Sequence, residues 1–402
     1  MSSRLRRPRP ATLRPLGSSR SRLWSAAAVV TVGTLIAMGA ALAPAGASPA
    51  GGQKSAFVQV NLVSNQPGVA PLQDTDLVNA WGLAASPGTD TAPGSPLWVS
   101  DNGTDMATLY FNGTATTVSK FPPLPAVSVT GAAPTGQVFN TDTNPNDFVV
   151  RDANGNSGRA QFIFDTENGT IDGWNAGVGV APGATPPSTV TEVARDNGAN
   201  AVYKGLAIAV ASDGHTYLYA TNFRSGRVEA YDSTFTPVEL PGGLFVDPKL
   251  PTGYGPFGIQ EINDQLYVSF AKQDSSLHDD VAGQGNGFVD VFTNDGAFVK
   301  RLITRGQLNS PWGLALAPNG FGNFGGDLLV GNFGDGSINV YNPNNGARVG
   351  ALRQPSGQPI VIDGLWGLRF GNGNAAKTGE LIFSAGPNGE ADGLLGKIVV
   401  AP

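Results

Sequence analysis

Short runs in which apolar and polar residues alternate follow one another along the chain from residue 57 to its end. PLWVSD (96–101) and ATLYFN (107–112) are two such runs, and polar residues separate them. Alternation with a period of two residues, bounded by Gly, Asn and Asp, is typical of β-strands and not of helices. Since no long amphipathic helical pattern interrupts these runs, the pattern predicts an all-β protein.

A short segment centred on glycine returns six times, first as Trp81-Gly82-Leu83 and last as Trp366-Gly367-Leu368. The glycines lie at positions 82, 136, 205, 258, 313 and 367, so the successive gaps are 54, 69, 53, 55 and 54 residues. Each segment is followed by a second apolar strand, a polar turn and a third strand. Several units end in a weaker fourth strand, such as residues 116–121 and 297–303. Four short antiparallel strands in a repeat of about 50 residues form one propeller blade. The sequence therefore predicts a six-bladed β-propeller with four-stranded antiparallel blades.

The two ends of the repeat region predict how the ring closes. Only 35 residues follow Gly367, too few for four strands, and FVQVNLV (57–63) precedes the first unit. We expect this N-terminal strand to complete the last blade, because closure removes exposed sheet edges. The longest gap is attributed to residues 177–200, a Pro- and Gly-rich segment expected to be a surface loop. In each unit the glycine allows innermost strands to approach closely, and the aromatic residue before it is expected to pack between blades.

The N-terminal segment has the pattern of an export signal. Residues 1–24 hold seven arginines, no lysine and no acid, residues 25–43 are apolar and uncharged, and Ala45-Gly46-Ala47 is a small-x-small cleavage site. We predict a signal peptide over 1–47, a disordered linker over 48–56 and one propeller domain over 57–402. A membrane anchor is the alternative, since 19 apolar residues are long enough to span a bilayer. General secretion and the twin-arginine route both stay open.

Charge and cysteine usage narrow the class of partner. Removing residues 1–47 takes seven arginines and no acid from the 25 basic and 31 acidic residues, so the net charge falls from −6 to −13. Because nucleic-acid binding depends on basic patches, we expect no nucleic-acid partner. The chain has no cysteine, which excludes thiolate chemistry and cysteine metal sites. We expect a secreted monomer with no membrane association after cleavage, and a small extracellular molecule as its ligand.

The repeated motifs resemble those of a known family. They are similar to NHL-like six-bladed propellers and, more closely, to a family of secreted bacterial β-propeller proteins of unassigned biochemical role. The resemblance covers nearly the whole mature chain and implies export and a propeller fold, but it supplies no catalytic residues. The segments that carry it are LVSNQPG (62–68), NAWGLA (79–84), YKGLAI (203–208), NFRSGRVEAYD (222–232), AKQDSSLHDDVAGQGNGFVDVF (271–292), NSPWGLALAP (309–318), GDLLVGNFGDGSINVYN (326–342) and DGLWGLRFGNG (363–373).

One rim of the predicted propeller gathers polar side chains. The loops from second to third strands share this rim with the connections that enter each first strand, and both are rich in Asn and Asp. Oxygen ligands of this kind suit a hard cation such as Ca²⁺ or another divalent ion. Asn-Gly and Asp-Gly are also ordinary hairpin-turn residues, which is the alternative explanation. The predicted metal ligands are Asp101, Asn222, Asp274, His278 and Asn332, and the predicted ligand-binding rim residues are Lys204, Lys272, Asp280 and Asp363.

The loop KQDSSLHDDVAGQGNGF (272–288) is the longest on this rim and holds one of the two histidines in the chain. His278 is the candidate base or metal ligand, with Asp279 or Asp280 orienting its ring, and His278 and Asp279 are the candidate catalytic pair. The alternative is a solvated loop without chemistry. The other histidine, His215, is expected in a surface turn on the opposite rim. DANGNSG (152–158) imitates the start of a calcium loop, but Ile163 replaces the closing glutamate, so we interpret it as a hairpin loop.

These features leave the biochemical role open between two classes. The first hypothesis is a secreted propeller that binds a cation or a small molecule on its acidic rim without catalysis. The alternative is a metal-dependent hydrolase or lyase, lactonase-like, that acts on a small extracellular molecule; it depends on analogy between folds. A purely structural exported protein is a third possibility, which the converging acidic rim disfavours.

Overall fold

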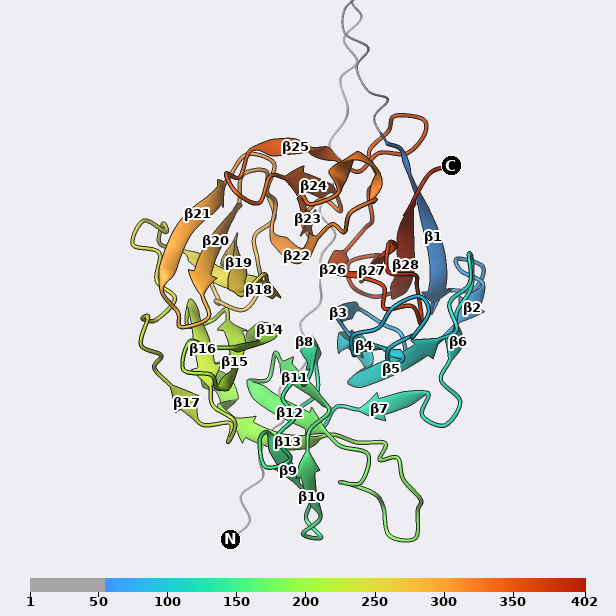
Figure 1. Cartoon of the computed structure of the whole chain (residues 1–402), viewed down its shortest axis with the longest axis vertical. Helices are drawn as coiled ribbons and strands as arrows, with labels where there is room; N and C mark the ends of the chain where they lie inside the picture. The colour runs from blue at the N-terminus through green and yellow to red at the C-terminus, as the bar shows by residue number, and fades with distance from the viewer. Residues whose placement is uncertain (1–54) are drawn as a thin grey trace, which may run out of the picture. The chain divides into compact units, whose positions relative to one another are not determined.

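The computed structural model describes residues 55–402. The predicted signal peptide and most of the predicted linker therefore lie outside the described residues. Within the described part of the chain, no helix is long and apolar enough to cross a membrane. Small antiparallel sheets surround a common centre, as Figure 1 shows, which confirms the predicted all-β six-bladed propeller.

Each blade runs outward from an inner strand that is the glycine-centred repeat (Figure 1). The first three blades are β3 (Ala80–Ala84), β4 (Leu97–Asp101), β5 (Met106–Phe111) and β6 (Ser119–Lys120); β8 (Pro134–Phe139), β11 (Phe162–Thr166), β12 (Thr170–Trp174) and β13 (Glu192–Asp196); and β14 (Tyr203–Val210), β15 (Thr216–Asn222), β16 (Arg227–Tyr231) and β17 (Pro237–Val238). The next two are β18 (Tyr254–Ile262), β19 (Gln265–Lys272), β20 (Gly287–Thr293) and β21 (Phe298–Thr304); and β22 (Pro311–Leu316), β23 (Leu328–Asn332), β24 (Ile338–Tyr341) and β25 (Arg348–Ala351).

The sixth blade closes the ring with strands from both ends of the propeller. It contains β26 (Leu365–Phe370), β27 (Leu381–Ala385) and β28 (Leu394–Val400), and its fourth strand is β1 (Phe57–Ser64), extended by β2 (Leu72–Gln73). β1 runs antiparallel to β28, with Phe57 opposite Val400 and Ser64 opposite Leu394. The predicted closure by an N-terminal strand is confirmed.

Two features of the second blade differ from the sequence prediction. The segment 177–200 is not only a loop, because it holds β13, the outer strand of that blade. Its strand pattern of five residues is short and lies among Pro and Gly residues that favour turns. The hairpin of β9 (Val149–Arg151) and β10 (Ser157–Arg159) was not predicted as a separate sheet, but the assignment of residues 152–158 to a hairpin loop is confirmed. β7 (Ala126–Ser128), which pairs with β5, was also not predicted.

The repeated glycines are explained by contacts between neighbouring inner strands. A Cβ atom on Gly205 would lie 3.0 Å from the backbone oxygen of Phe257 on β18. At Gly258, Gly313 and Gly367 it would collide with the backbone carbonyl of the next inner strand around the ring. The collision of Gly367 is with Trp81, which returns the chain of contacts to the first blade. Only glycine permits this approach, so the repeat records how tightly the inner strands pack.

The aromatic residues of the repeat do not pack between blades as expected. They meet one another at the centre of the ring, because side chains from blades that are not neighbours in the ring are in contact. Trp81 stacks on Trp366 with ring centroids 3.4 Å apart, and Trp366 also contacts Phe257 at 5.7 Å. We call this group the aromatic cluster. Its members are Trp81, Phe223, Phe257, Trp312, Phe333 and Trp366.

Candidate functional site

A lysine occupies the central position that an aromatic residue holds in four of the six blades. Lys204 directly precedes Gly205, as Trp81 precedes Gly82, and its side chain is only 2% exposed. Its Nζ lies 5.2 Å from the ring centroid of Trp81 and forms ion pairs with Glu167 and, at 3.4 Å, with Asp279. The backbone oxygen of Lys204 accepts a hydrogen bond of 2.8 Å from Nε1 of Trp312. The ammonium group is therefore fixed above the aromatic cluster, near the propeller axis.

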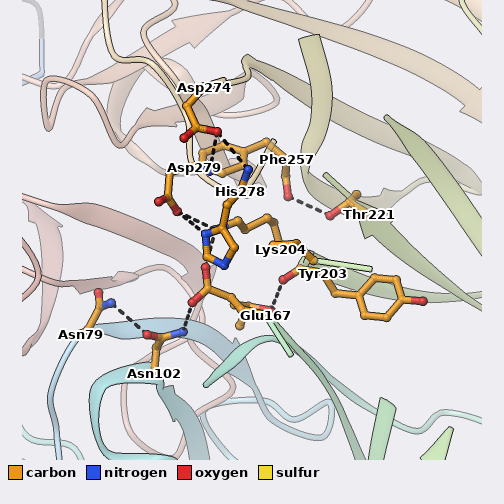
Figure 2. A network of polar contacts seen from close by, with 12 residues as sticks. Asn79, Asn102, Glu167, Tyr203, Lys204, Thr221, Phe257, Asp274, His278 and Asp279 are labelled. Carbon is orange, nitrogen blue, oxygen red and sulfur yellow. Dashed lines mark hydrogen bonds and ion pairs between the residues drawn. The ribbon is translucent and has the colours of Figure 1, made fainter. Parts of the chain in front are cut away.

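A chain of hydrogen bonds orients Glu167 toward this lysine (Figure 2). Nε1 of Trp366 donates to Oδ1 of Asn79 at 3.1 Å, and Nδ2 of Asn79 donates to Oδ1 of Asn102 at 3.2 Å. Nδ2 of Asn102 then donates to Oε2 of Glu167 at 2.9 Å. The carboxylate is held by the first, second and sixth blades and is only 15% exposed. Its position is thus set by the fold and not by solvent.

The long loop between β19 and β20 brings a histidine to the same place. Nδ1 of His278 lies 2.8 Å from Oδ1 of Asp279, which itself contacts Lys204 (Figure 2). Asp274 accepts backbone hydrogen bonds from His278 at 3.0 Å and from Asp279 at 3.3 Å. A further hydrogen bond from the Ser276 hydroxyl helps to hold the pKa of Asp274 below its ordinary value. These hydrogen bonds to Asp274 order the loop, which holds the His278 imidazole and the Asp279 carboxylate at the central opening of the ring.

Three of these groups have the geometry of a metal-ligand set. One ligand atom each from Glu167, His278 and Asp279 lies within 4.8 Å of the other two. The side chain of His278 is 37% exposed and that of Asp279 is 68% exposed, so the set is open to solvent above the buried lysine. Two carboxylates and one imidazole suit borderline divalent ions such as Zn²⁺ or Mn²⁺.

The same charged groups contribute to the pKa shifts of two further carboxyl groups. Burial, reinforced by the negative charge of Glu167, raises the pKa of Glu390 to about 7. Burial also raises the pKa of Asp280, although the charge of Lys204 opposes the change. Burial acts in the same direction on Asp279, but its hydrogen bond to His278 and the charge of Lys204 hold its pKa below the ordinary value.

We call this group the axial cluster, and it combines four carboxyl groups and a histidine with a single lysine. Its members are Glu167, Lys204, His278, Asp279, Asp280 and Glu390. They come from the second, third, fourth and sixth blades. Even with Glu390 protonated, the carboxylates outnumber the ammonium group.

The structure separates three of the predicted metal ligands from the axial cluster. Asp101, Asn222 and Asn332 each end the second strand of their blade and are almost fully buried. Asp101 accepts the Thr108 amide at 2.9 Å, Asn222 donates to Glu229 at 2.7 Å, and Asn332 donates to the Gln307 oxygen at 2.7 Å. Since each side chain binds within its own blade or the connection that enters it, these contacts give it the role of fixing a turn.

The remaining predicted residues divide between the centre and the rim. His278 and Asp279, the predicted catalytic pair, are in contact, and Lys204 and Asp280 belong to the axial cluster. Lys272 is exposed at the end of β19. Asp363 accepts a hydrogen bond of 2.8 Å from the Asn388 amide and so holds the turn that carries Glu390.

Glu167 and Glu390 were missed as site residues, and His215 was placed correctly. Both glutamates follow the second strand of their blades, in turns whose composition is otherwise that of ordinary hairpins. One signal was present, since these two turns carry glutamate where other rim turns carry Asn, Asp and Gly. His215 lies in the turn between β14 and β15, with its side chain 77% exposed.

The sequence has two long viral relatives. It is 32% identical over 346 residues to "Uncharacterized protein R648" of Acanthamoeba polyphaga mimivirus, which covers 84% of this chain and 78% of that protein. It is 33% identical over 348 residues to "Uncharacterized protein L690" of the same virus, which covers 84% of each. No family model matches the chain. The bacterial origin and the export implied by the resemblance stay predictions.

Solved structures align with the chain at low sequence identity. The soluble aldose sugar dehydrogenase from Escherichia coli, in its apo form, aligns with 86% of this chain and 100% of its own, at 11% identity and a TM-score of 0.48. A likeness at this level concerns the fold alone and carries no argument about chemistry.

Proposed function

This chain belongs to the same protein family as the mimivirus proteins R648 and L690, and we propose that it is a cation-binding propeller. One divalent cation is held at the axial mouth by Glu167, His278 and Asp279. The observation that carries the proposal is the convergence of these three groups within 4.8 Å of one another at the centre of the ring.

The charge balance of the axial cluster supports a missing positive charge. Glu167, Asp279, Asp280 and Glu390 face one lysine, and the pKa of Glu390 is raised to about 7 by burial and by the other carboxylates. Carboxyl groups that repel one another bind a proton or a cation more readily. A divalent ion held by Glu167, His278 and Asp279 would balance part of this negative charge.

The donor set also narrows the choice of ion. Ca²⁺ prefers six to eight oxygen ligands, whereas an imidazole with two carboxylates suits Zn²⁺ or Mn²⁺. The expectation of Ca²⁺ or another divalent cation is therefore narrowed to Zn²⁺ or Mn²⁺. A small polar molecule would complete the coordination from the solvent side, where Asp279 is 68% exposed. As the N-terminal sequence predicts, this binding would occur outside the cell.

The test is a calorimetric titration of the mature protein with Mn²⁺, Zn²⁺ and Ca²⁺. We expect one site per chain, with affinity lowered about tenfold to a hundredfold in His278→Ala and in Glu167→Gln, the range for the loss of an ordered ligand or its support. His215→Ala is the matched control, because His215 is the other histidine and lies exposed on the opposite rim. Equal loss in both histidine variants, or no cation binding by the wild type, would remove the proposal.

Glu390 favours a second candidate, a metal-assisted hydrolase of small molecules. A carboxyl group with a pKa of about 7 beside a metal-ligand set is suited to act as a general base at neutral pH. Glu390 would accept a proton from water, and Glu167, His278 and Asp279 would hold the cation. The test is a pH-stat assay on a panel of small lactones with the cation-loaded protein. We expect Glu390→Gln to lower kcat by about a hundredfold or more; hydrolysis that is unchanged in this variant would refute the role.

A further inference from the structure

Three adjoining cavities lie along the inner strands, on the side of the repeated glycines that faces away from the axial cluster. A small cavity of about 40 Å³ is lined by five of these glycines, with Leu83, Gln137 and Gln260. It adjoins a cavity of about 200 Å³, with which it shares the lining residues Leu206 and Gln260, and a cavity of about 370 Å³, with which it shares Gln260 and Leu314. The larger cavities share Gln260, Glu261 and Arg369. Together they form a funnel toward the rim opposite the axial cluster.

Arg369 lines both of the larger cavities and comes from β26 of the sixth blade. It lies three residues after Trp366 of the aromatic cluster, about 10 Å further along an extended strand. Its Nη2 donates to the backbone oxygen of Ala85 at 2.8 Å. Its Nε is buried and has no hydrogen-bond partner within residues 55–402.

Among the described residues, no carboxylate lies within ion-pair distance of this guanidinium. Burial alone lowers the pKa of Arg369 to about 10, and no negative charge opposes the change. An acidic residue, Glu261, lines the same cavities, but its carboxylate accepts the Asp264 amide at 2.7 Å. Burying a charged group without a counter-charge is costly. An acidic protein that nonetheless keeps a half-buried arginine without a counter-charge in a cavity has a reason to do so if a ligand supplies the anion.

We propose that this funnel is a binding site for a small carboxylate, whose oxygens pair with Nε and with the remaining N–H of Nη2 of Arg369. A guanidinium presents two parallel N–H groups to a carboxylate, and this pairing is strong where water is excluded. Gln137 and Gln260 offer amide groups around the same space. The carboxylate of Glu261 lines the funnel as an acceptor, so it selects a ligand that also carries a hydroxyl or ammonium group. This site is independent of the axial cation site, because the aromatic cluster and the ring of glycines stand between them.

The experiment measures binding of four small ligands, three anions and one zwitterion, to the full mature chain by calorimetry and thermal shift. Glycolate and glycine carry a carboxylate with a hydroxyl or ammonium group, acetate carries the carboxylate alone, and inorganic phosphate tests the other oxyanion that arginine binds. We expect glycolate or glycine to bind more tightly than acetate and phosphate. Arg369→Gln should lower the affinity at least about tenfold, the range for losing a charge-assisted hydrogen bond.

Two further variants keep the result decisive. Arg369→Lys keeps the charge but loses the fork and should bind with intermediate affinity, and it replaces Arg369→Gln if that variant does not fold. Arg151→Gln removes the same charge from an exposed position on β9 and should bind as the wild type does. Without ligand, Arg369→Gln should melt at or above the wild-type temperature, because it removes an unpaired buried charge. Absence of anion binding by the wild type, preference for phosphate, or equal affinity in the wild type and Arg369→Lys would overturn the proposal.

Discussion

Replacing Lys204 by methionine separates the charge balance of the axial cluster from its packing. The lysine side chain is 2% exposed and pairs with Glu167, which is 15% exposed, and with Asp279, which is 68% exposed. Removing one partner of a buried ion pair costs about 3–5 kcal/mol. Because solvent screens the Asp279 pair, its contribution is small. We therefore expect the free energy of unfolding without cation to fall by about 3 kcal/mol, the lower end of that range.

The same substitution should strengthen cation binding. Two unit charges 4 Å apart interact by about 4 kcal/mol at an effective dielectric constant of about 20, and a divalent ion doubles this repulsion. The flexible lysine can relax away from an incoming ion, so we expect only part of this repulsion to be recovered. A recovery of about 1.4–2.8 kcal/mol corresponds to a tenfold to hundredfold gain in affinity. Saturating cation should then return most of the lost stability.

The assay combines urea denaturation with calorimetric titration of Mn²⁺. Lys397→Met is the matched control, since Lys397 is 1% exposed and pairs with Glu380 at 2.8 Å, outside the axial cluster. It should be destabilised to a similar degree and keep the wild-type cation affinity. If Lys204→Met binds Mn²⁺ no more tightly than the wild type, the lysine does not compete with a cation and the account of the charge balance is wrong.

Three other substitutions test the ring and its mouth. Gly258→Ala forces a Cβ into a backbone carbonyl of the next inner strand and should lower the free energy of unfolding by about 3 kcal/mol or more. Gly205→Ala, whose Cβ would lie 3.0 Å from the nearest carbonyl oxygen, should lower it by about 1 kcal/mol. Equal losses in urea denaturation would contradict the close approach of the inner strands. The pKa of Glu390 is about 7 in the folded state against an ordinary 4.5, so its contribution to stability is present below pH 4.5 and is lost as pH rises through 7. Glu390→Gln should remove this pH-dependent loss of stability. Parallel pH–stability curves for the wild type and the variant would refute this prediction. Trp366→Phe deletes the donor to Asn79 and should weaken Mn²⁺ binding about threefold to tenfold with little change in fold, as calorimetry and circular dichroism would show.

The architecture was predictable because it is repetitive. Six glycines at nearly constant spacing define the inner strands, and the close contact of Gly258 with the next blade is the physical reason for the repeat. The short count of residues after Gly367 then required a strand from the other end, which β1 supplies. The outer strand β13 was missed because outer strands are short and half-exposed, so they lack a strong alternating pattern.

The site was predictable only in part. The position and length of the loop pointed to His278 and Asp279, which contact each other, and Asp279 also contacts Lys204. Glu167 could not be selected, because several turns on that rim carry acids and the sequence does not say which side chains turn toward the axis. Asp101 shows the opposite case. Its position at a strand end matches that of the corresponding residues in other blades, but its carboxylate accepts a hydrogen bond from the Thr108 backbone amide. The stronger clue was Lys204 itself, the one charged residue at the central position of the repeat.

Anomalous diffraction from crystals grown with Mn²⁺ tests the central claim most directly. The account predicts one strong peak per chain, with a carboxylate oxygen of Glu167, a ring nitrogen of His278 and a carboxylate oxygen of Asp279 within about 2.0–2.3 Å, the distances of first-row metal ligands. A peak elsewhere, or none at these residues at saturating Mn²⁺, would contradict it.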